Sequence, residues 1–309
     1  MNYKNLDIKK SIEFNLPRRI ISYMTTSSWQ NIPHVSFIYE PDITDFYDEY
    51  KKLARERSKM GYKVTFNTIM LKVIIEGLLS APDLNSYVEY NYKNTRGMTH
   101  LIEDINISIP WLLPDGKMIT PTILNANKMS IKDISSYMLN LAKRIEKTNI
   151  DEVLYRVVYT DTLNELKNFN PRVIKRILAS QFGGNKITRL KGKEKENYYS
   201  IPESERLSEK DIILGTVTVS NIGSLYKEQK GFLALLEIIP PQVLAIGLAS
   251  IQEKAGIQLL KNGNREIGIR KVLPMSLAFD HRAVDFSSIV PFLKRLDEIF
   301  INPNVIHKW

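Results

Sequence analysis

The stretch LAFDHRAVDF, residues 277 to 286, joins an alternating, strand-like run to the sequence Asp280-His281-Arg282. His281 is one of only four histidines in the chain, and Asp285 follows it four residues later. A neutral imidazole is a suitable general base near neutral pH when a second group fixes its tautomer and orientation. Because a single His-x-x-x-Asp pair is common by chance, the rest of the chain decides what this one means.

Composition sets the broad class of protein. The chain has 309 residues, 43% of them apolar and 25% charged, as in globular proteins with a sizeable core. It contains no cysteine, which excludes disulfides, thiolate zinc sites and cysteine nucleophiles, and no metal is expected. The N-terminus is too polar for a secretory signal, and no apolar run approaches the roughly 20 residues that span a bilayer. We therefore expect a cytoplasmic protein with no membrane partner.

Positive charge is concentrated in one segment. The chain carries a net charge of +9, and residues 167–195 contain nine basic residues against one acid. A single basic segment favours a local docking surface, with a solvated loop as the alternative. Nucleic-acid binding is not expected, since no base-reading or stacking motif accompanies the charge.

Hydrophobic periodicity predicts helices and strands that do not alternate regularly. Helices are expected over 18–30, 43–60, 66–81, from a cap at Ser130 to about 147, and over 287–300; two more, broken at Pro171, are expected over 151–182. Strands are expected at 35–43, in a hairpin over 105–124, at 211–223, at 242–251 and in a hairpin over 256–279; residues 183–206 read as loop. This pattern predicts one α+β domain over residues 1–309.

The C-terminal region resembles a known family. LPMSLAFDHRAVDFSSIVPFLKRLDEIFINP resembles the end of the dihydrolipoamide acyltransferases of 2-oxo acid dehydrogenase complexes, whose signature is Asp-His-Arg, two residues, Asp-Gly. Residues 280–285 match its first six positions, and chloramphenicol acetyltransferase shares the His-x-x-x-Asp core. Four other segments resemble the same family in the same order: LPRRIISYMTTSSWQNIPHVSFIYEPDIT, DINISIPWLLPDGKMITPTI, LSEKDIILGTVTVSNIGSL and IIPPQVLAIGLASIQEK.

The resemblance implies a fold and a reaction. The fold would be a chloramphenicol acetyltransferase-like mixed sheet flanked by helices. His281 would be the general base for an acceptor that attacks an acyl-CoA thioester, with acetyl-CoA as the expected co-substrate. Ser220 would donate a hydrogen bond to the oxyanion, although a hydroxyl at a strand end is also common in turns. The site would lie between the subunits of a homotrimer, with His281 from one chain and Ser220 from its neighbour.

The resemblance also implies a structural brace for the histidine loop. Asp285 would hold the loop through Arg18 or Arg19, and Asp280 and Arg282 would belong to the same brace. Of the other histidines, His34 is expected to be structural, and His100 and His307 are expected on the surface.

Three departures from the family affect the choice of acceptor. Phe286 replaces the motif glycine and is a candidate for the acceptor pocket. No lipoyl or subunit-binding module is expected before the domain, and no covalently attached lipoate is expected. Residues 148–206 form a mainly helical basic insertion in which Lys175, Arg176, Lys186 and Arg189 are candidates for docking an acidic carrier or lipoyl protein. The C-terminus also lacks the family's leucine-rich tail.

Three functions fit these observations. The first is a free-standing acyltransferase that moves a short acyl group to a hydroxyl of a small or carrier-bound metabolite. The second is a lipoamide acyltransferase core that acts on a separate lipoyl protein. The third is a non-catalytic trimeric scaffold in which Phe286 blocks the channel.

Overall fold

The computed structural model describes residues 7–14, 16–114, 116–157, 190–259 and 263–309. Its centre is a six-stranded mixed sheet, which confirms the predicted α+β class. The strands in spatial order are β1 (His34–Tyr39), β12 (Met275–Asp280), β9 (Leu244–Leu248), β8 (Val217–Asn221), β4 (Ile107–Ser108) and β7 (Thr122–Ile123). β12 runs antiparallel to both β1 and β9, whereas β8 runs parallel to both β9 and β4.

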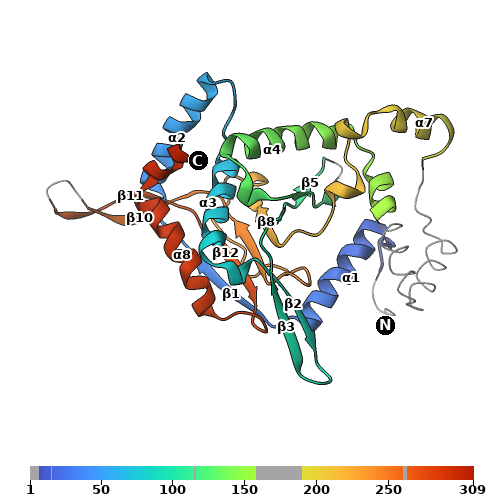
Figure 1. Ribbon diagram of the computed structural model, residues 1–309, viewed down its shortest axis with the longest axis horizontal. Coiled ribbons are helices and arrows are strands. Elements are labelled where there is room, and N and C mark those ends of the chain that lie inside the picture. Colours follow the sequence, from blue (N-terminus) through green and yellow to red (C-terminus); the bar gives the residue numbers. More distant parts are fainter. Residues whose placement is uncertain (1–6, 15, 115, 158–189, 260–262) are drawn as a thin grey trace.

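Helices pack beside this sheet (Figure 1). They are α1 (Leu16–Asn31), α2 (Thr44–Lys59), α3 (Phe66–Ser80), α4 (Ile131–Glu146) and α8 (Phe286–Ile301). α3 is buried along most of its length, as its continuous apolar sequence predicts. A Cβ at Gly77 would lie 2.6 Å from Leu296 and 2.7 Å from Phe292, so a glycine is needed where α3 crosses α8.

Local sequence signals explain several boundaries. Gly61, with φ of +88°, follows the end of α2 as predicted. Ser130 caps α4 through a reciprocal capping box with Asp133. Pro291 lies in the second turn of α8, where it cannot donate a backbone hydrogen bond to the preceding turn.

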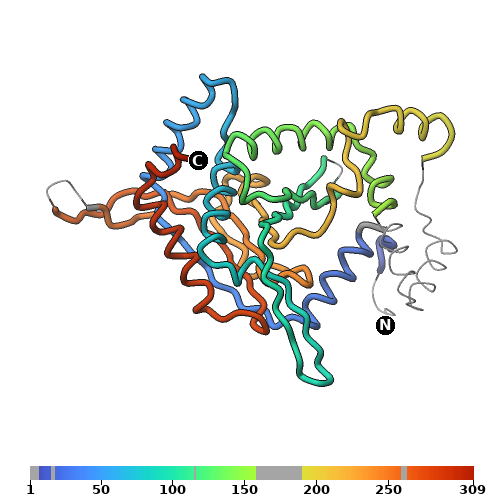
Figure 2. Tube along the Cα trace, in the orientation of Figure 1, coloured from blue at the N-terminus to red at the C-terminus, as the bar shows by residue number. Residues whose placement is uncertain are grey.

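Two long ribbons leave the body of the protein (Figure 2). One pairs β10 (Gln252–Leu259) with β11 (Arg265–Val272), as the hairpin pattern predicts. The other pairs β2 (Ser86–Asn91) with β3 (Arg96–Leu101) and is missing from the sequence prediction. A shorter hairpin of β5 (Trp111–Leu112) and β6 (Met118–Ile119) surrounds the predicted turn at 114–116.

The predicted loop over 183–206 is wrong in part, because α7 (Gly192–Ser200) lies within it. Tyr199 holds α7 to the described helical residues 150–157, where its hydroxyl donates to Glu152 at 2.6 Å. Burial and this hydrogen bond raise the pKa of Tyr199 to about 12. The proposed break at Pro171 lies outside the described residues. Within the part of the chain that the structure describes, no helix is long and apolar enough to cross a membrane.

Candidate active site

His281 follows the last residue of β12, with a side chain about half exposed at 50%. Its backbone N–H donates to the Pro33 carbonyl at 3.1 Å, which ties the loop to the chain entering β1. Its Nδ1 lies 3.2 Å from the Val284 carbonyl and 3.2 Å from Asp285 Oδ1. Both neighbours are acceptors, so Nδ1 carries the proton and Nε2 keeps a lone pair. His281 is thus arranged as an accessible general base.

Asp280 and Arg282 fix the backbone on either side of His281. The Asp280 side chain is fully buried and accepts hydrogen bonds from the Arg282 backbone at 2.9 Å and from its guanidinium at 2.5 to 3.1 Å. The Asp280 carboxylate holds the pKa of Arg282 above its already high value. Because both charges are paired, this brace is stable at the end of a buried strand.

The brace proposed for Asp285 differs in the structure. Arg18 and Arg19 lie exposed near the start of α1, and thirteen helical residues at 1.5 Å each place Arg18 about 20 Å from the end of α1 beside the His281 loop. Asp285 is instead 75% exposed and contacts His281 in its own loop. Within one chain, therefore, Asp285 orients the imidazole and is not held by Arg18 or Arg19.

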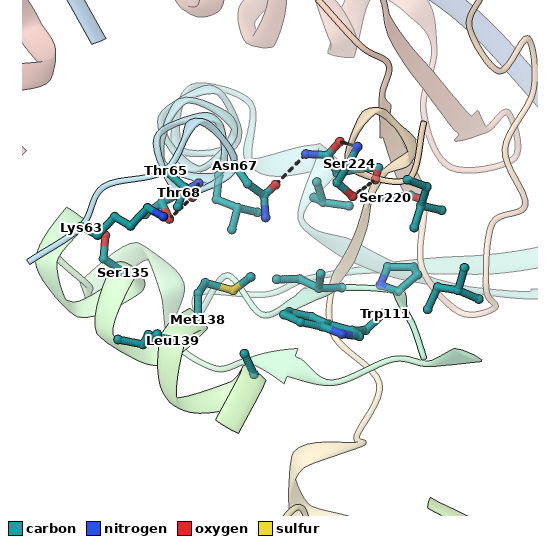
Figure 3. Close-up of a pocket in the computed structure, with 18 of the residues that line it drawn as sticks. Lys63, Thr65, Asn67, Thr68, Trp111, Ser135, Met138, Leu139, Ser220 and Ser224 are labelled. Atoms are coloured by element: carbon teal, nitrogen blue, oxygen red, sulfur yellow. Dashed lines mark hydrogen bonds between the residues drawn. The ribbon is translucent and has the colours of Figure 1, made fainter. Parts of the chain in front are cut away.

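Ser220 lies near the end of β8, in the wall of a pocket of about 900 Å³. Thr65, Asn67, Thr68, Ser220 and Ser224 gather along one wall, and Trp111, Met138 and Leu139 face them across the opening (Figure 3). A polar wall opposite an apolar wall suits an extended ligand that carries amides on an aliphatic chain.

The turn after Ser220 is held tightly in place. Asn221 accepts a hydrogen bond from the Ser224 backbone at 3.1 Å and donates to Asn67 at 3.0 Å, which links β8 to the start of α3. A Cβ at Gly223 would lie 2.5 Å from the Ala249 carbonyl oxygen, so only glycine allows the turn to approach β9 so closely. Ser220 is thus fixed at a rigid strand end.

His281 and Ser220 of one chain lie at opposite ends of the sheet. Ser220 pairs with Gly247, Gly247 pairs with Ser276, and His281 is five residues beyond Ser276. Strand geometry converts this register into about 16 Å along the strands and about 10 Å across them. A single chain therefore does not bring the two predicted catalytic groups together.

Phe286 is the first residue of α8, a position without a positive φ, so no glycine is needed there. Its ring contacts Phe37 at 5.0 Å, on the His281 side of the sheet. It does not line the pocket around Ser220. A role for Phe286 at the acceptor remains a prediction.

The remaining predicted residues have separate places. Lys175, Arg176, Lys186 and Arg189 lie outside the described residues. His34 bonds to the backbone of Ile32 and Ile238, and His100 is on the exposed β3. His307 was expected on the surface but is partly buried, with its ring nitrogens 2.8 Å from Glu49 and 3.4 Å from Glu56.

The sequence analysis missed most residues of the pocket wall. Asn221 stood inside a quoted motif, and Met138 lay in the helix predicted after Ser130 without being marked as a pocket residue, yet it faces the pocket. Trp111 and Asn67 gave no signal of their own, because residues far apart in sequence form this wall only after folding. In the described ranges, no cluster of His, Cys, Asp or Glu is placed to hold a metal ion.

Comparison with known proteins agrees with this arrangement. Residues 7–153 and 192–307 match the family described as 2-oxoacid dehydrogenases acyltransferase (catalytic domain). The chain belongs to this family. The intervening segment, 154–191, is shorter than the insertion expected over 148–206.

Two curated relatives share the name dihydrolipoyllysine-residue acetyltransferase component of pyruvate dehydrogenase complex. The protein of Haemophilus influenzae is 23% identical over 94% of this chain and 39% of its own length. That of Staphylococcus epidermidis is 24% identical over 94% of this chain and 50% of its own length. The chain thus spans about half or less of these relatives.

Solved structures show the same fold. The cubic core of a pyruvate dehydrogenase multienzyme complex superposes with a TM-score of 0.66 at 17% identity, covering 99% of this chain and 97% of that one. A probable dihydrolipoamide acetyltransferase from Listeria monocytogenes gives 0.63 at 21% identity, with 95% of each chain covered.

Proposed function

We propose that this chain is the catalytic core of a lipoamide acyltransferase, which transfers an acyl group between coenzyme A and a protein-bound dihydrolipoyl thiol. The observation that most supports this proposal is the oriented, accessible imidazole of His281 in a chain of the acyltransferase family. The names of the relatives favour a lipoyl acceptor over the hydroxyl acceptor expected first from the sequence. That first expectation, of a free-standing natural-product acyltransferase, is not supported.

The residues define the steps of the transfer. Nε2 of His281 removes the proton of the attacking thiol, and the sulfur adds to the thioester carbonyl carbon. The Ser220 hydroxyl donates to the oxyanion of the tetrahedral intermediate, where a fixed donor stabilises the developing charge. When the intermediate collapses, the carbon–sulfur bond to the other thiol breaks, and the imidazolium returns the proton to the departing sulfur.

The pocket beside Ser220 supports an arm-like substrate. Both coenzyme A and a lipoyl-lysine present a thiol or thioester at the end of a long chain that contains amides. The serine, threonine and asparagine side chains of one wall can bond such amides, while Trp111, Met138 and Leu139 pack on the aliphatic part. A pocket of about 900 Å³ is far larger than an acetyl group alone requires.

A second copy of the chain completes the site in this proposal. The β10–β11 ribbon leaves the sheet next to Leu248 and Met275, at the end where Ser220 lies. One ribbon face carries Ile257, Ile267 and Ile269, which are 70%, 81% and 73% exposed. A neighbour that brings its His281 to this end would lie beside the ribbon and could cover these isoleucines, as in the expected homotrimer.

The test is an acceptor comparison with purified protein. We expect acetyl transfer from acetyl-CoA to dihydrolipoamide and faster transfer to a reduced lipoyl domain. The His281→Ala variant should lose about 10²–10⁴-fold in rate, the usual loss for a general base. Transfer to hydroxyl acceptors with none to dihydrolipoamide would overturn the lipoyl assignment, and no transfer to either acceptor would favour a scaffold.

A further inference from the structure

We infer that Tyr90, on the β2–β3 ribbon, is a positioning residue for His281 that acts through Arg282. This inference rests on the proposed function. It starts from the environment of Arg282, whose side chain is only 15% exposed although it follows the half-exposed His281. Asp280 binds one edge of the Arg282 guanidinium. The Tyr90 ring also lies near this group, with 5.9 Å between the ring centroid and Arg282 Cζ.

The contact belongs to a continuous chain of side chains. The Tyr90 ring packs edge to face on Tyr92 with 5.0 Å between centroids. The Tyr92 hydroxyl donates to the Asn31 carbonyl at 3.5 Å, at the last residue of α1. Tyr90 thus connects the end of α1 to the Arg282–Asp280 pair, and through that pair to the peptide of His281. In Figures 1 and 2 the β2–β3 ribbon passes the end of α1.

The residue opposite Tyr90 on the β2–β3 ribbon leaves room for the Tyr90 ring. Gly97 is paired with Tyr90 across the ribbon. A Cβ at Gly97 would lie 3.0 Å from the Tyr90 ring and 3.1 Å from the Glu89 carbonyl oxygen. The ring therefore occupies space that a side chain at position 97 would crowd, so Gly97 allows the position of the ring beside Arg282.

The physical effect follows from how Arg282 is held. Asp280 binds the guanidinium in its plane, and an aromatic ring close to the guanidinium attracts it by a cation–π interaction. Without the ring, the Arg282 guanidinium stays paired with Asp280 but is freer to change its angle to that carboxylate. The loop around His281 is then held less precisely, and small errors in the placement of a catalytic base reduce turnover steeply.

Tyr90 and Tyr92 lie outside the core, so their effect on catalysis can be measured separately from their effect on the stability of the fold. Tyr90 and Tyr92 are both exposed, so their removal leaves no cavity in the core. We expect Tyr90→Ala to lower kcat about tenfold, with the KM for acetyl-CoA changed less than twofold and the thermal midpoint nearly unchanged. Tyr90→Phe keeps the ring and should retain wild-type kcat. Met98→Ala, on the opposite face of the same ribbon, is the matched control and should be neutral.

Two measurements decide the inference. In kinetics, wild-type kcat for Tyr90→Ala, or equal losses for Tyr90→Ala and Met98→Ala, would overturn it. The second measurement records the side-chain nitrogen resonances of His281 by NMR, which needs no catalysis. We expect them to shift or broaden in Tyr90→Ala and to stay at the wild-type positions in Tyr90→Phe; unchanged resonances in both would also overturn it. An inactive wild type with a Tyr90-dependent His281 signal would reject the proposed function and leave the positioning role in place.

Discussion

At the scale of the residue, His281 is oriented by groups that can only accept a hydrogen bond. The Val284 carbonyl and the Asp285 carboxylate both lie 3.2 Å from Nδ1, which leaves Nε2 as the base. The family resemblance implied a bracing role for Asp285, shared with Asp280 and Arg282. In the structure Asp280 fills that role by pairing with Arg282. Its carboxylate is fully buried, and a buried charge needs an opposite charge beside it.

Asp285→Asn should therefore affect rate more than stability. The side chain is 75% exposed, so the free energy of unfolding should change by less than about 0.5 kcal/mol. Because Val284 still accepts from Nδ1, we expect a loss in kcat of about tenfold or less, smaller than that for a missing base. Thermal denaturation and steady-state kinetics check this. A large loss of stability would restore the bracing role.

Ser220→Ala should reduce turnover and leave binding almost intact. The hydroxyl lies at a rigid strand end in the pocket wall and acts only when the oxyanion forms. Loss of one such donor usually costs about 10²–10³-fold in kcat. We expect the dissociation constant of coenzyme A, measured by calorimetry, to change less than threefold. Equal losses in binding and turnover would assign Ser220 to substrate binding.

At the scale of the element, the β10–β11 ribbon has two unlike faces. Ile257 pairs directly with Ile267, and Ala255 with Ile269, so the exposed apolar residues share one face. Gln258 and Glu266 pair on the other face. A ribbon exposed on both sides would place polar residues on each, and the asymmetry therefore favours a surface that is covered in the assembly.

Ile267→Lys should weaken the assembly, and Glu266→Lys is its control. The two positions are adjacent and face opposite sides of the ribbon, and the substitution adds the same side chain at each. We expect the first variant to sediment as smaller species with little acyl transfer, while its far-ultraviolet circular dichroism stays native. The second should resemble the wild type. Identical behaviour of the two variants would exclude the ribbon as the contact.

At the scale of the whole molecule, the sheet separates the two predicted catalytic groups. Register places His281 and Ser220 at opposite ends, about 16 Å apart along the strands alone. Closing this distance within one chain would require the central sheet to be rebuilt. Assembly of two copies, each contributing one end, needs no such change.

Mixing inactive variants tests this shared site. Chains with His281→Ala and chains with Ser220→Ala should each be nearly inactive. When they are unfolded together and refolded, some mixed assemblies contain one intact site, in which both groups are wild type. We expect activity to return to a substantial fraction of the wild-type value, whereas either variant refolded alone should stay inactive. No recovery in a mixed oligomer of proven composition would reject the shared site.

The sequence alone predicted most of the helices and marked His281 as the candidate catalytic base. Periodicity predicted the bounds of α2, α3, α4 and α8 to within one residue. A helix that buries one face has apolar residues at every third or fourth position, and a fully buried helix is apolar throughout. The Asp-His-Arg motif identified His281 because its neighbours along the chain, Asp280 and Arg282, are also its neighbours in space. Signals of this kind can be read from the sequence because the residues involved are close together along the chain.

Tertiary structure alone decided which residues meet. The polar and apolar walls of the pocket come from α3, α4, β5 and β8, and no local pattern marks Asn67 or Trp111 as partners of Ser220. Long-range register likewise placed Ser220 and His281 at opposite ends of the sheet and set the Tyr90 ring beside Arg282. These contacts depend on how strands pair and helices cross, which burial of the whole core determines and no short stretch of sequence encodes.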